Sequence, residues 1–167
     1  MKRLILVRHG QTTKDKTNPD RGLSPRGIIQ VKALSQRLQS LVIPPTIILH
    51  SPTHRAQQTA SIIAKTFHAN TKPADLRLKN IDLLQLKGMQ PAPAYLNLNQ
   101  YGNIESPPEL VNRWLKIFNS INHTTVIAIS HEASLEAFFY HQTRFKLEHK
   151  SFRKFFNYTD FASLLTL

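Results

Sequence analysis

Apolar runs alternate with amphipathic stretches along this chain, a pattern that predicts strands separated by helices. Residues 4–7 (LILV) and 126–129 (VIAI) are continuous apolar runs, which are typical of strands buried on both faces. Residues 46–49 (TIIL) form a third short strand rich in β-branched side chains, and residues 161–167 are expected to add an edge strand. These runs point to a sheet that is covered on both faces.

Four other stretches repeat apolar residues every three or four positions, as the buried face of a helix does. Ser24 is a suitable N-cap for the first of them, Pro25 suits its first helical position, and Pro44–Pro45 stop it. Residues 13–22 and 70–106 are polar or rich in proline and predict irregular connections. The predicted helices cover residues 24–41, 52–67, 108–121 and 132–141.

The order of these elements predicts an α/β fold, a three-layer α/β/α sandwich whose central sheet is mostly parallel. With 167 residues, a single domain over residues 1–167 is the expected organisation. Binding sites in such sheets lie beyond the carboxyl ends of the strands, so candidate chemistry is expected there.

The composition excludes several classes of protein and site. The chain has no cysteine, which rules out disulfides, thiolate zinc sites and cysteine nucleophiles. No segment approaches the ~18 apolar residues of a membrane span. The apolar run before Arg8 is also too short for the core of a signal peptide. We therefore expect a soluble, cytoplasmic protein.

The charge balance favours anionic partners. Lys and Arg number 22 against 10 Asp and Glu, which gives a formal net charge of +12 and a pI near 10.3. Phosphorylated molecules, nucleic acid and acidic membrane surfaces are all compatible with this excess. Residues 144–154 interleave basic side chains with phenylalanines, as some RNA-binding segments do. Core aromatics beside a basic surface explain that stretch more simply, so nucleic acid is not the expected partner.

Basic and polar side chains directly follow each of the three predicted parallel strands. Because the carboxyl ends of parallel strands share one edge of the sheet, these side chains should gather there. Two guanidiniums and two imidazoles in one place describe a site for a dianion, since Arg binds phosphate oxygens bidentately. A neutral imidazole in line with phosphorus can also act as a nucleophile. The residues concerned are Arg8–His9, His50–Ser51 with Arg55 shortly after, and Ser130–His131.

Each of these residues has a plainer explanation when it is considered alone. A histidine at a strand end is usually a surface residue, and an arginine there is usually paired with a carboxylate. His50 and His54 have the four-residue spacing of a metal pair, but Pro52 breaks a shared helix, so no metal site is predicted. The chain also lacks a GxxxxGK[ST] loop, so an NTP-binding P-loop is not supported.

Several segments resemble motifs of the histidine phosphatase superfamily, which is also called phosphoglycerate-mutase-like. LVRHGQT resembles its opening motif, SPTHRAQQTA resembles SPxxRAxQTA, and VIAISH resembles the strand that ends in the second catalytic histidine. LSPRGIIQVKAL and GNIES are similar to its first-helix pattern and to its GGES segment. The motifs occur in the family's order, and the likeness covers nearly the whole chain.

The resemblance implies roles for individual residues. It makes His9 the phosphorylated nucleophile, with Arg8 and Arg55 binding the phosphoryl oxygens. It places His131 in the phosphate pocket, where it stabilises the transition state. Gly10, which would let the backbone approach closely, and Thr12 belong to the same opening motif and are assigned to phosphate or substrate binding. The family uses neither a metal nor an organic cofactor.

The proton donor is where this chain departs from the family pattern. The glutamate that commonly donates the proton falls on Asn80, and an amide cannot serve as that acid. Glu132 follows the second histidine, where glycine is usual, and is a candidate donor together with Asp82. The alternative for Glu132 is a carboxylate in the first turn of a helix, where its charge suits the helix dipole.

The resemblance favours a phosphatase over a mutase. The mutases carry an asparagine where this chain has Asp15, and they carry insertions for which it has no room. The expected activity is hydrolysis of a phosphomonoester through phosphohistidine at His9. Two alternatives stay open: a phosphohistidine protein phosphatase, and a non-catalytic phosphate-binding or scaffold protein, which Asn80 would support. The expected partner is a phosphorylated small molecule or phosphoprotein, not a membrane, and the oligomeric state is undetermined.

Overall fold

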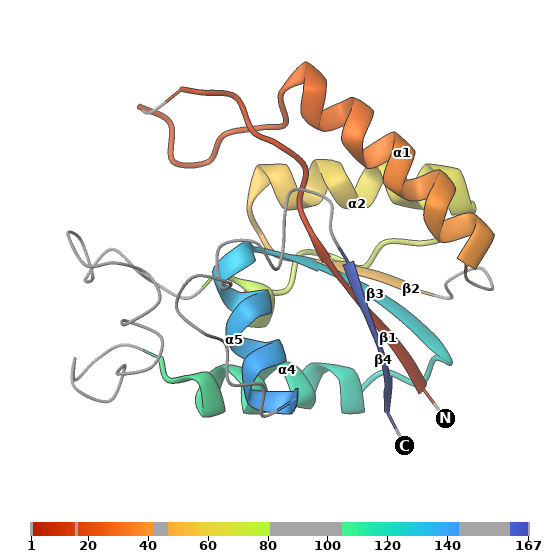
Figure 1. Ribbon diagram of the computed structural model, residues 1–167, viewed down its shortest axis with the longest axis vertical. Coiled ribbons are helices and arrows are strands. Elements are labelled where there is room, and N and C mark those ends of the chain that lie inside the picture. Colours follow the sequence, from red (N-terminus) through yellow and green to blue (C-terminus); the bar gives the residue numbers. More distant parts are fainter. Residues whose placement is uncertain (1, 16, 42–46, 81–104, 144–160, 167) are drawn as a thin grey trace.

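The computed structural model of the protein describes residues 2–15, 17–41, 47–80, 105–143 and 161–166. At the centre of these residues lies a sheet with the strand order β2-β3-β1-β4 (Figure 1). Strands β1, β2 and β3 run parallel, and β4 pairs antiparallel with β1. The predicted mostly parallel sheet and its edge strand are therefore confirmed. The strands are β1 (Lys2–Arg8), β2 (Ile47–His50), β3 (Thr125–Ser130) and β4 (Phe161–Thr166).

Helices cover both faces of this sheet, as the sequence predicts for a three-layer sandwich. On one face α1 (Pro25–Leu41) packs beside α2 (His54–Phe67), and on the other α4 (Pro107–Asn119) packs beside α5 (Glu132–Thr143) (Figure 1). A short 3-10 turn, η1 (Leu76–Leu78), follows α2. No helix in the described part of the chain is long and apolar enough to cross a membrane.

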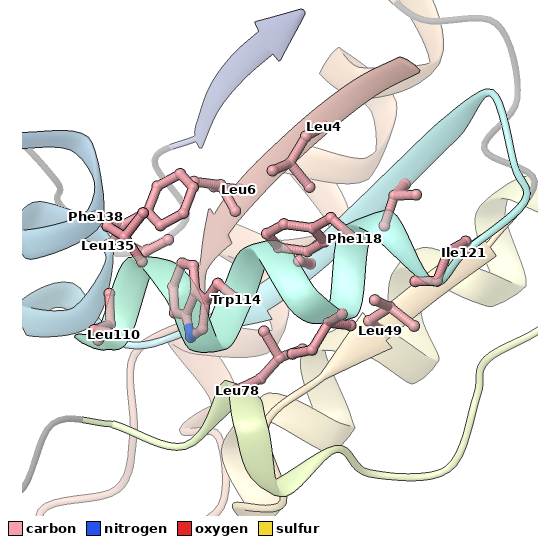
Figure 2. Packing of buried hydrophobic residues seen from close by; sticks show 14 of the residues in the cluster. Leu4, Leu6, Leu49, Leu78, Leu110, Trp114, Phe118, Ile121, Leu135 and Phe138 are labelled. Carbon is pink, nitrogen blue, oxygen red and sulfur yellow. The ribbon is translucent and has the colours of Figure 1, made fainter. Parts of the chain in front are cut away.

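Alternate residues of β1 point into two separate hydrophobic cores. Ile5 and Val7 belong to the cluster under α1 and α2, whereas Leu4 and Leu6 belong to the cluster under α4 and α5. Figure 2 shows the second cluster, in which Trp114 stacks on Phe138 with ring centroids 5.0 Å apart. A continuous apolar run such as LILV is therefore needed because both faces of this strand are covered.

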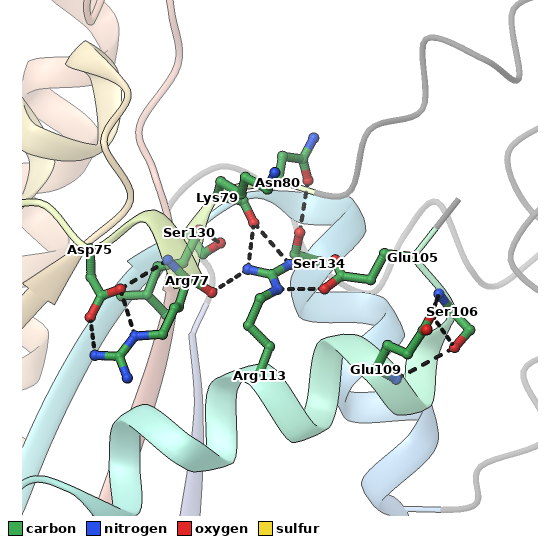
Figure 3. Close-up of polar contacts among 11 residues, drawn as sticks. Asp75, Arg77, Lys79, Asn80, Glu105, Ser106, Glu109, Arg113, Ser130 and Ser134 are labelled. Atoms are coloured by element: carbon green, nitrogen blue, oxygen red, sulfur yellow. Dashed lines mark hydrogen bonds and ion pairs between the residues drawn. The ribbon is translucent and has the colours of Figure 1, made fainter. Parts of the chain in front are cut away.

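Local chemistry explains where the helix boundaries differ from the predicted ones. Helix α2 begins at His54 rather than Pro52, and the carboxylate of Asp20 accepts a hydrogen bond from the His54 N–H at 2.7 Å. Helix α4 begins at Pro107 because Ser106 and Glu109 form a capping box just before it (Figure 3). An S-x-x-E pattern was thus present in the sequence, but the start was expected one residue later.

The first part of the predicted irregular stretch is ordered along the edge of β2. The N–H of Ile48 bonds to the carbonyl of Asn70 at 3.3 Å, and the N–H of Asp75 bonds to the carbonyl of His50 at 3.0 Å. The chain then turns through η1, which buries Leu78 in the α4–α5 core. This path brings residues 78–80 to the carboxyl end of β3, where Ser130 Oγ donates to the carbonyl of Leu78 at 2.9 Å.

Some sequence predictions concern residues that are outside the described ranges. They are the Pro44–Pro45 stop, the candidate donor Asp82, the start of GNIES and the basic, aromatic stretch at 144–154.

Candidate active site

The strand register places the two candidate histidines side by side. Arg8 in β1 pairs with Ser130 in β3, so the residues that follow them, His9 and His131, leave the sheet together. The His9 N–H donates to the carbonyl of Ser130 at 3.2 Å, and the Ser51 N–H donates to that of Ile129 at 2.9 Å. The three parallel strands therefore end at one edge, as predicted.

Hydrogen bonds determine which tautomer His9 adopts. Its Nδ1 lies 2.8 Å from the carbonyl oxygen of Gly10, which can only accept, so Nδ1 carries the proton. Its Nε2 lies 3.2 Å from Nε of Arg55, which can only donate. Nε2 therefore presents a lone pair, and the imidazole is neutral.

The surroundings of His9 keep it neutral over a wide range of pH. Burial lowers the pKa of His9 from 6.5 to about 3, assisted by the positive charges of Arg55, Arg8 and Arg21 and opposed by the hydrogen bond to Gly10. The side chain is 7% exposed. An imidazole that is neutral and carries its lone pair on Nε2 is the form that attacks phosphorus.

His131 lies across from His9 and is neutral for the same reasons. The two ring centroids are 5.1 Å apart, with the rings at 66°. Burial lowers the pKa of His131 to about 2, with further contributions from His9, Arg55 and Arg8. Its Nε2 lies 2.8 Å from Ser51 Oγ, and its Nδ1 lies 3.5 Å from Nη2 of Arg55. Because the guanidinium can only donate, the Nδ1 of His131 is an acceptor and its Nε2–H donates to Ser51.

Arg55 is the residue that joins these groups. It lies in the first turn of α2, and its guanidinium contacts His9, His131 and the carbonyl of Pro19, the last at 3.3 Å. Helix α2 begins shortly after β2 ends, so the positive end of its dipole is near this edge of the sheet and favours an anion there.

Arg8 points to the opposite face of the sheet and meets a carboxylate. Its Nη2 lies 2.7 Å from Oε2 of Glu132, the first residue of α5. The Arg8 side chain is 12% exposed and that of Glu132 is 37% exposed. Glu132 is thus next to the site, which a proton donor must be. It is held there, however, as the ion-pair partner of Arg8.

Gly10 is required by packing against α1. A Cβ at this position would lie 2.8 Å from both the carbonyl oxygen of Gly27 and Cγ2 of Val31. The Gly10 N–H is bonded to Thr59 Oγ1 at 3.2 Å. The close approach that excludes a side chain is therefore to the helix, whereas the sequence interpretation assigned it to a ligand.

The remaining candidates lie around this centre. Thr12 forms a backbone bridge with Leu23, which closes the base of the loop between β1 and α1. Asn80 accepts a hydrogen bond from Ser134 Oγ at 2.9 Å, so the position of the family acid faces the first turns of α5 (Figure 3). His50 directs Nδ1 to the carbonyl of Ser51 at 2.8 Å.

Sequence reasoning assigned no role to three residues around this site, although it expected Ser51 at the sheet edge. Ser51 and Thr59 lie within SPTHRAQQTA, so the motif contained the signal, but only its arginine was given a role. Arg21 lies in a polar loop where neither periodicity nor spacing distinguishes it from the neighbouring lysines. Its position near His9 appears only once the loop is folded.

The match to a known family adds an independent observation. The model of the Histidine phosphatase superfamily (branch 1) matches residues 4–164. The chain belongs to this superfamily. A comparison with curated proteins found no match.

Solved structures of this histidine phosphatase fold include enzymes with different substrates. The phosphoserine phosphatase of Entamoeba histolytica in complex with 3-phosphoglyceric acid is 22% identical, with a TM-score of 0.71 over 99% of this chain and 91% of that one. A mycobacterial glucosyl-3-phosphoglycerate phosphatase is 18% identical, with a TM-score of 0.69 over 97% and 89%. The putative phosphohistidine phosphatase SixA of Agrobacterium tumefaciens is 16% identical, with a TM-score of 0.68 over 97% and 90%. At these identities the likeness establishes the fold alone.

Proposed function

We propose that the protein is a phosphohydrolase in which His9 accepts the phosphoryl group of a phosphomonoester and passes it to water. The observation that carries this proposal is the state of His9. Its imidazole is neutral, its Nε2 lone pair faces the guanidinium of Arg55, and its Nδ1–H is held by Gly10. A residue that only bound phosphate would have little use for a deprotonated Nε2.

The reaction would proceed in two displacements. Nε2 of His9 attacks phosphorus, the bond from phosphorus to the leaving oxygen breaks, and that oxygen keeps the electron pair and takes a proton when it is an alkoxide. Water then attacks the phosphohistidine, the N–P bond breaks, and inorganic phosphate leaves. Arg8, Arg55 and His131 would neutralise and orient the phosphoryl oxygens, which is the main requirement of phosphoryl transfer.

A trapping experiment tests the nucleophile. The wild-type protein, mixed with a ³²P-labelled phosphomonoester and quenched in alkali, should carry acid-labile label, because phosphohistidine is a phosphoramidate. His9→Ala should carry none and should not turn substrate over, although it should still bind inorganic phosphate. Label on any other residue of the wild type would refute the assignment. Phosphate binding without turnover by the wild type would instead support a non-catalytic binder.

A second candidate function is hydrolysis of phosphohistidine on proteins. It is favoured by the state of the two acid positions, because Asn80 is an amide bonded to Ser134 and Glu132 is paired with Arg8. An imidazole leaves more readily than an alkoxide, so the reaction depends less on an acid. Purified protein assayed against phosphohistidine peptides and alkyl phosphomonoesters would separate the two functions by their kcat/KM values.

The net charge of +12 supports an anionic substrate in either case. We also propose that the protein acts in the cytoplasm. Localisation of the tagged full-length chain by fractionation tests this directly.

A further inference from the structure

The charges at the candidate active site do not balance a phosphoryl dianion. Arg8 and Arg55 contribute two positive charges, and Glu132, which is bound to Arg8, removes one. His9 and His131 contribute none, because both are neutral. The site as described so far therefore has one net positive charge, whereas a phosphomonoester at neutral pH carries nearly two negative ones.

Arg21 lies in a loop that is fastened to this site at several points. The loop connects β1 with α1 (Figure 1), and its base is closed by the hydrogen bond from the Thr13 N–H to the carbonyl of Gly22 at 3.1 Å. The two residues before Arg21 contact the first turn of α2, since Pro19 accepts from Arg55 and Asp20 caps the helix at His54. The segment that precedes Arg21 is thereby placed against α2.

Further along, the same helix holds the loop again. The N–H of Leu23 donates to Oε1 of Gln58 at 2.6 Å, one turn after Arg55. Arg21 is therefore bracketed by contacts with α2 at residues 54, 55 and 58, which fixes the point from which its side chain extends.

The Arg21 side chain has a buried donor that no described group satisfies. Its Nε is buried and has no hydrogen-bond partner within the described ranges. A buried donor on a charged group is costly unless an acceptor meets it. The charge of Arg21 also contributes to the lowered pKa of His9, which places the guanidinium within electrostatic reach of the proposed nucleophile.

Nearby carboxylates do not cancel this charge. Asp20 directs its carboxylate to the backbone N–H of His54 at the start of α2, and none of the ion pairs among the described residues joins it to Arg21. Asp15 is also within reach of Arg21, but its carboxylate is fully exposed and bonded to Thr17 at 2.9 Å and 2.6 Å, so solvent screens it. The Arg21 guanidinium thus remains available to an anion bound beside His9.

We propose that Arg21 is a third phosphoryl-binding guanidinium whose charge compensates for Glu132, so that the site matches a dianionic phosphomonoester. This inference rests on the proposed function. It assigns Arg21 a direct contact with phosphoryl oxygens and predicts selection against singly charged phosphodiesters. The positive charge of Arg21 would then replace the one that Glu132 cancels.

Direct binding of inorganic phosphate, measured by titration calorimetry, tests this without requiring turnover. Arg21→Gln should weaken phosphate binding by about tenfold or more, which corresponds to about 1.4 kcal/mol. Lys14→Gln removes the same charge from an exposed position of the same loop and should change binding less than about twofold, because an exposed charge is screened.

A compensating variant distinguishes charge from structure. Glu132→Gln alone should tighten phosphate binding, and the double variant Arg21→Gln/Glu132→Gln should regain at least part of the lost affinity because its net charge equals that of the wild type. A merely structural role for Arg21 would give a lower melting temperature and no such recovery. Wild-type affinity in Arg21→Gln, or no recovery in a folded double variant, would overturn the proposal. Failure of the wild type itself to bind phosphate would instead refute the proposed function.

Discussion

Glu132 holds Arg8 at 2.7 Å, so the residue that follows one histidine is an ion-pair partner of the residue that precedes the other. The pair joins the end of β1 to the start of α5. A phosphoryl dianion that binds Arg8 must compete with this carboxylate. At an effective dielectric constant of 20, two like charges 4 Å apart repel by about 4 kcal/mol. When substrate binds, the negative charge of Glu132 therefore opposes it unless a further positive charge offsets that carboxylate.

If Glu132 donates the proton to the leaving group, Glu132→Gln should slow the hydrolysis of alkyl phosphates much more than that of p-nitrophenyl phosphate. An alkoxide needs a proton in order to leave, whereas a nitrophenolate barely does. The measurement is kcat for both substrates at saturation. Equal losses on the two substrates would indicate damage to the site, and no loss on either would leave Glu132 as a carboxylate at a helix start.

Ser51 should act through His131. Ser51→Ala removes the oxygen that receives the Nε2–H of His131, so the ring is free to turn and its Nδ1 no longer faces Arg55. We expect kcat to fall by about ten- to a hundredfold, as misplaced catalytic groups commonly cause. KM should change little.

Ser35→Ala is the matched control for that variant. Ser35 is also fully buried, but its hydroxyl donates within α1, to the carbonyl of Val31. Ser35→Ala should lower the melting temperature without changing kcat. If both variants reduce activity in parallel with stability, Ser51 has no particular effect on His131.

The two neutral histidines should make the protein sensitive to mild acid. Their folded-state pKa values, about 3 for His9 and about 2 for His131, lie far below the value of 6.5 expected in the unfolded chain. As pH falls below 6.5, the two histidines become protonated in the unfolded chain but stay neutral in the folded protein, so the free energy of unfolding decreases. At pH values well below 6.5, each histidine should lower the free energy of unfolding by about 1.4 kcal/mol for every further pH unit.

Urea unfolding between pH 6.5 and 4.5 measures this effect, because the carboxylates with lowered pKa values titrate mainly at lower pH. The double variant His9→Asn/His131→Asn should lose most of the slope of unfolding free energy against pH. A slope equal to that of the wild type would mean that these histidines become protonated in the folded protein.

The strand ends explain why so much of the site could be predicted from sequence. Arg8–His9 and Ser130–His131 follow directly from buried apolar runs, and parallel strands necessarily end at one edge. Arg55 was predicted at the same edge, both from its position shortly after His50–Ser51 and from a motif, and it lies in the first turn of α2. Local sequence therefore determined which groups gather, but not how their charges are distributed.

Contacts between distant segments could not be predicted in this way. The Arg8–Glu132 pair spans more than a hundred residues, and the position of Arg21 depends on a loop that α2 fastens through Asp20 and Leu23. The packing of Gly10 against α1 was likewise not predicted, because the sequence interpretation considered only the approach of the backbone to a ligand. Such features arise when distant segments pack together, and hydrophobic periodicity in the sequence does not indicate which segments will meet.

Among the three glycines that the structure describes, Gly27 should be the least tolerant of a side chain. It lies in α1, where alanine is normally preferred by about 1 kcal/mol. A Cβ there would overlap the carbonyl oxygen of Gln11, which is backbone and cannot move easily. We expect Gly27→Ala to lower the free energy of unfolding by about 2 kcal/mol, seen as a lower melting temperature.

Gly22→Ala provides the comparison for Gly27. Its Cβ would meet Oε1 of Gln58 at 2.9 Å, which is the end of a flexible side chain. This variant should be clearly more stable than Gly27→Ala. Equal stability would mean that the segment after Gly10 can move away from α1.

The last prediction concerns the position of the missing acid. Asn80 is bonded to Ser134 near the start of α5 (Figure 3). The first residue of this helix pairs with Arg8. Asn80→Asp keeps the shape of the side chain and replaces the amide with a group that is able to donate a proton to a leaving alkoxide. The Ser134 hydroxyl would still find an acceptor oxygen there, so the variant should fold. If the proposed phosphomonoesterase activity is limited by the lack of an acid, kcat for alkyl phosphates should rise by about tenfold, which is less than the roughly 10²- to 10⁴-fold that a well-placed general acid contributes. The rate on p-nitrophenyl phosphate should stay nearly constant. Asn80→Ala, which removes the amide without adding an acid, is the control and should not raise either rate. A loss of alkyl phosphatase activity in Asn80→Asp would contradict the prediction, because the new carboxylate would then be acting only as a negative charge that repels the substrate.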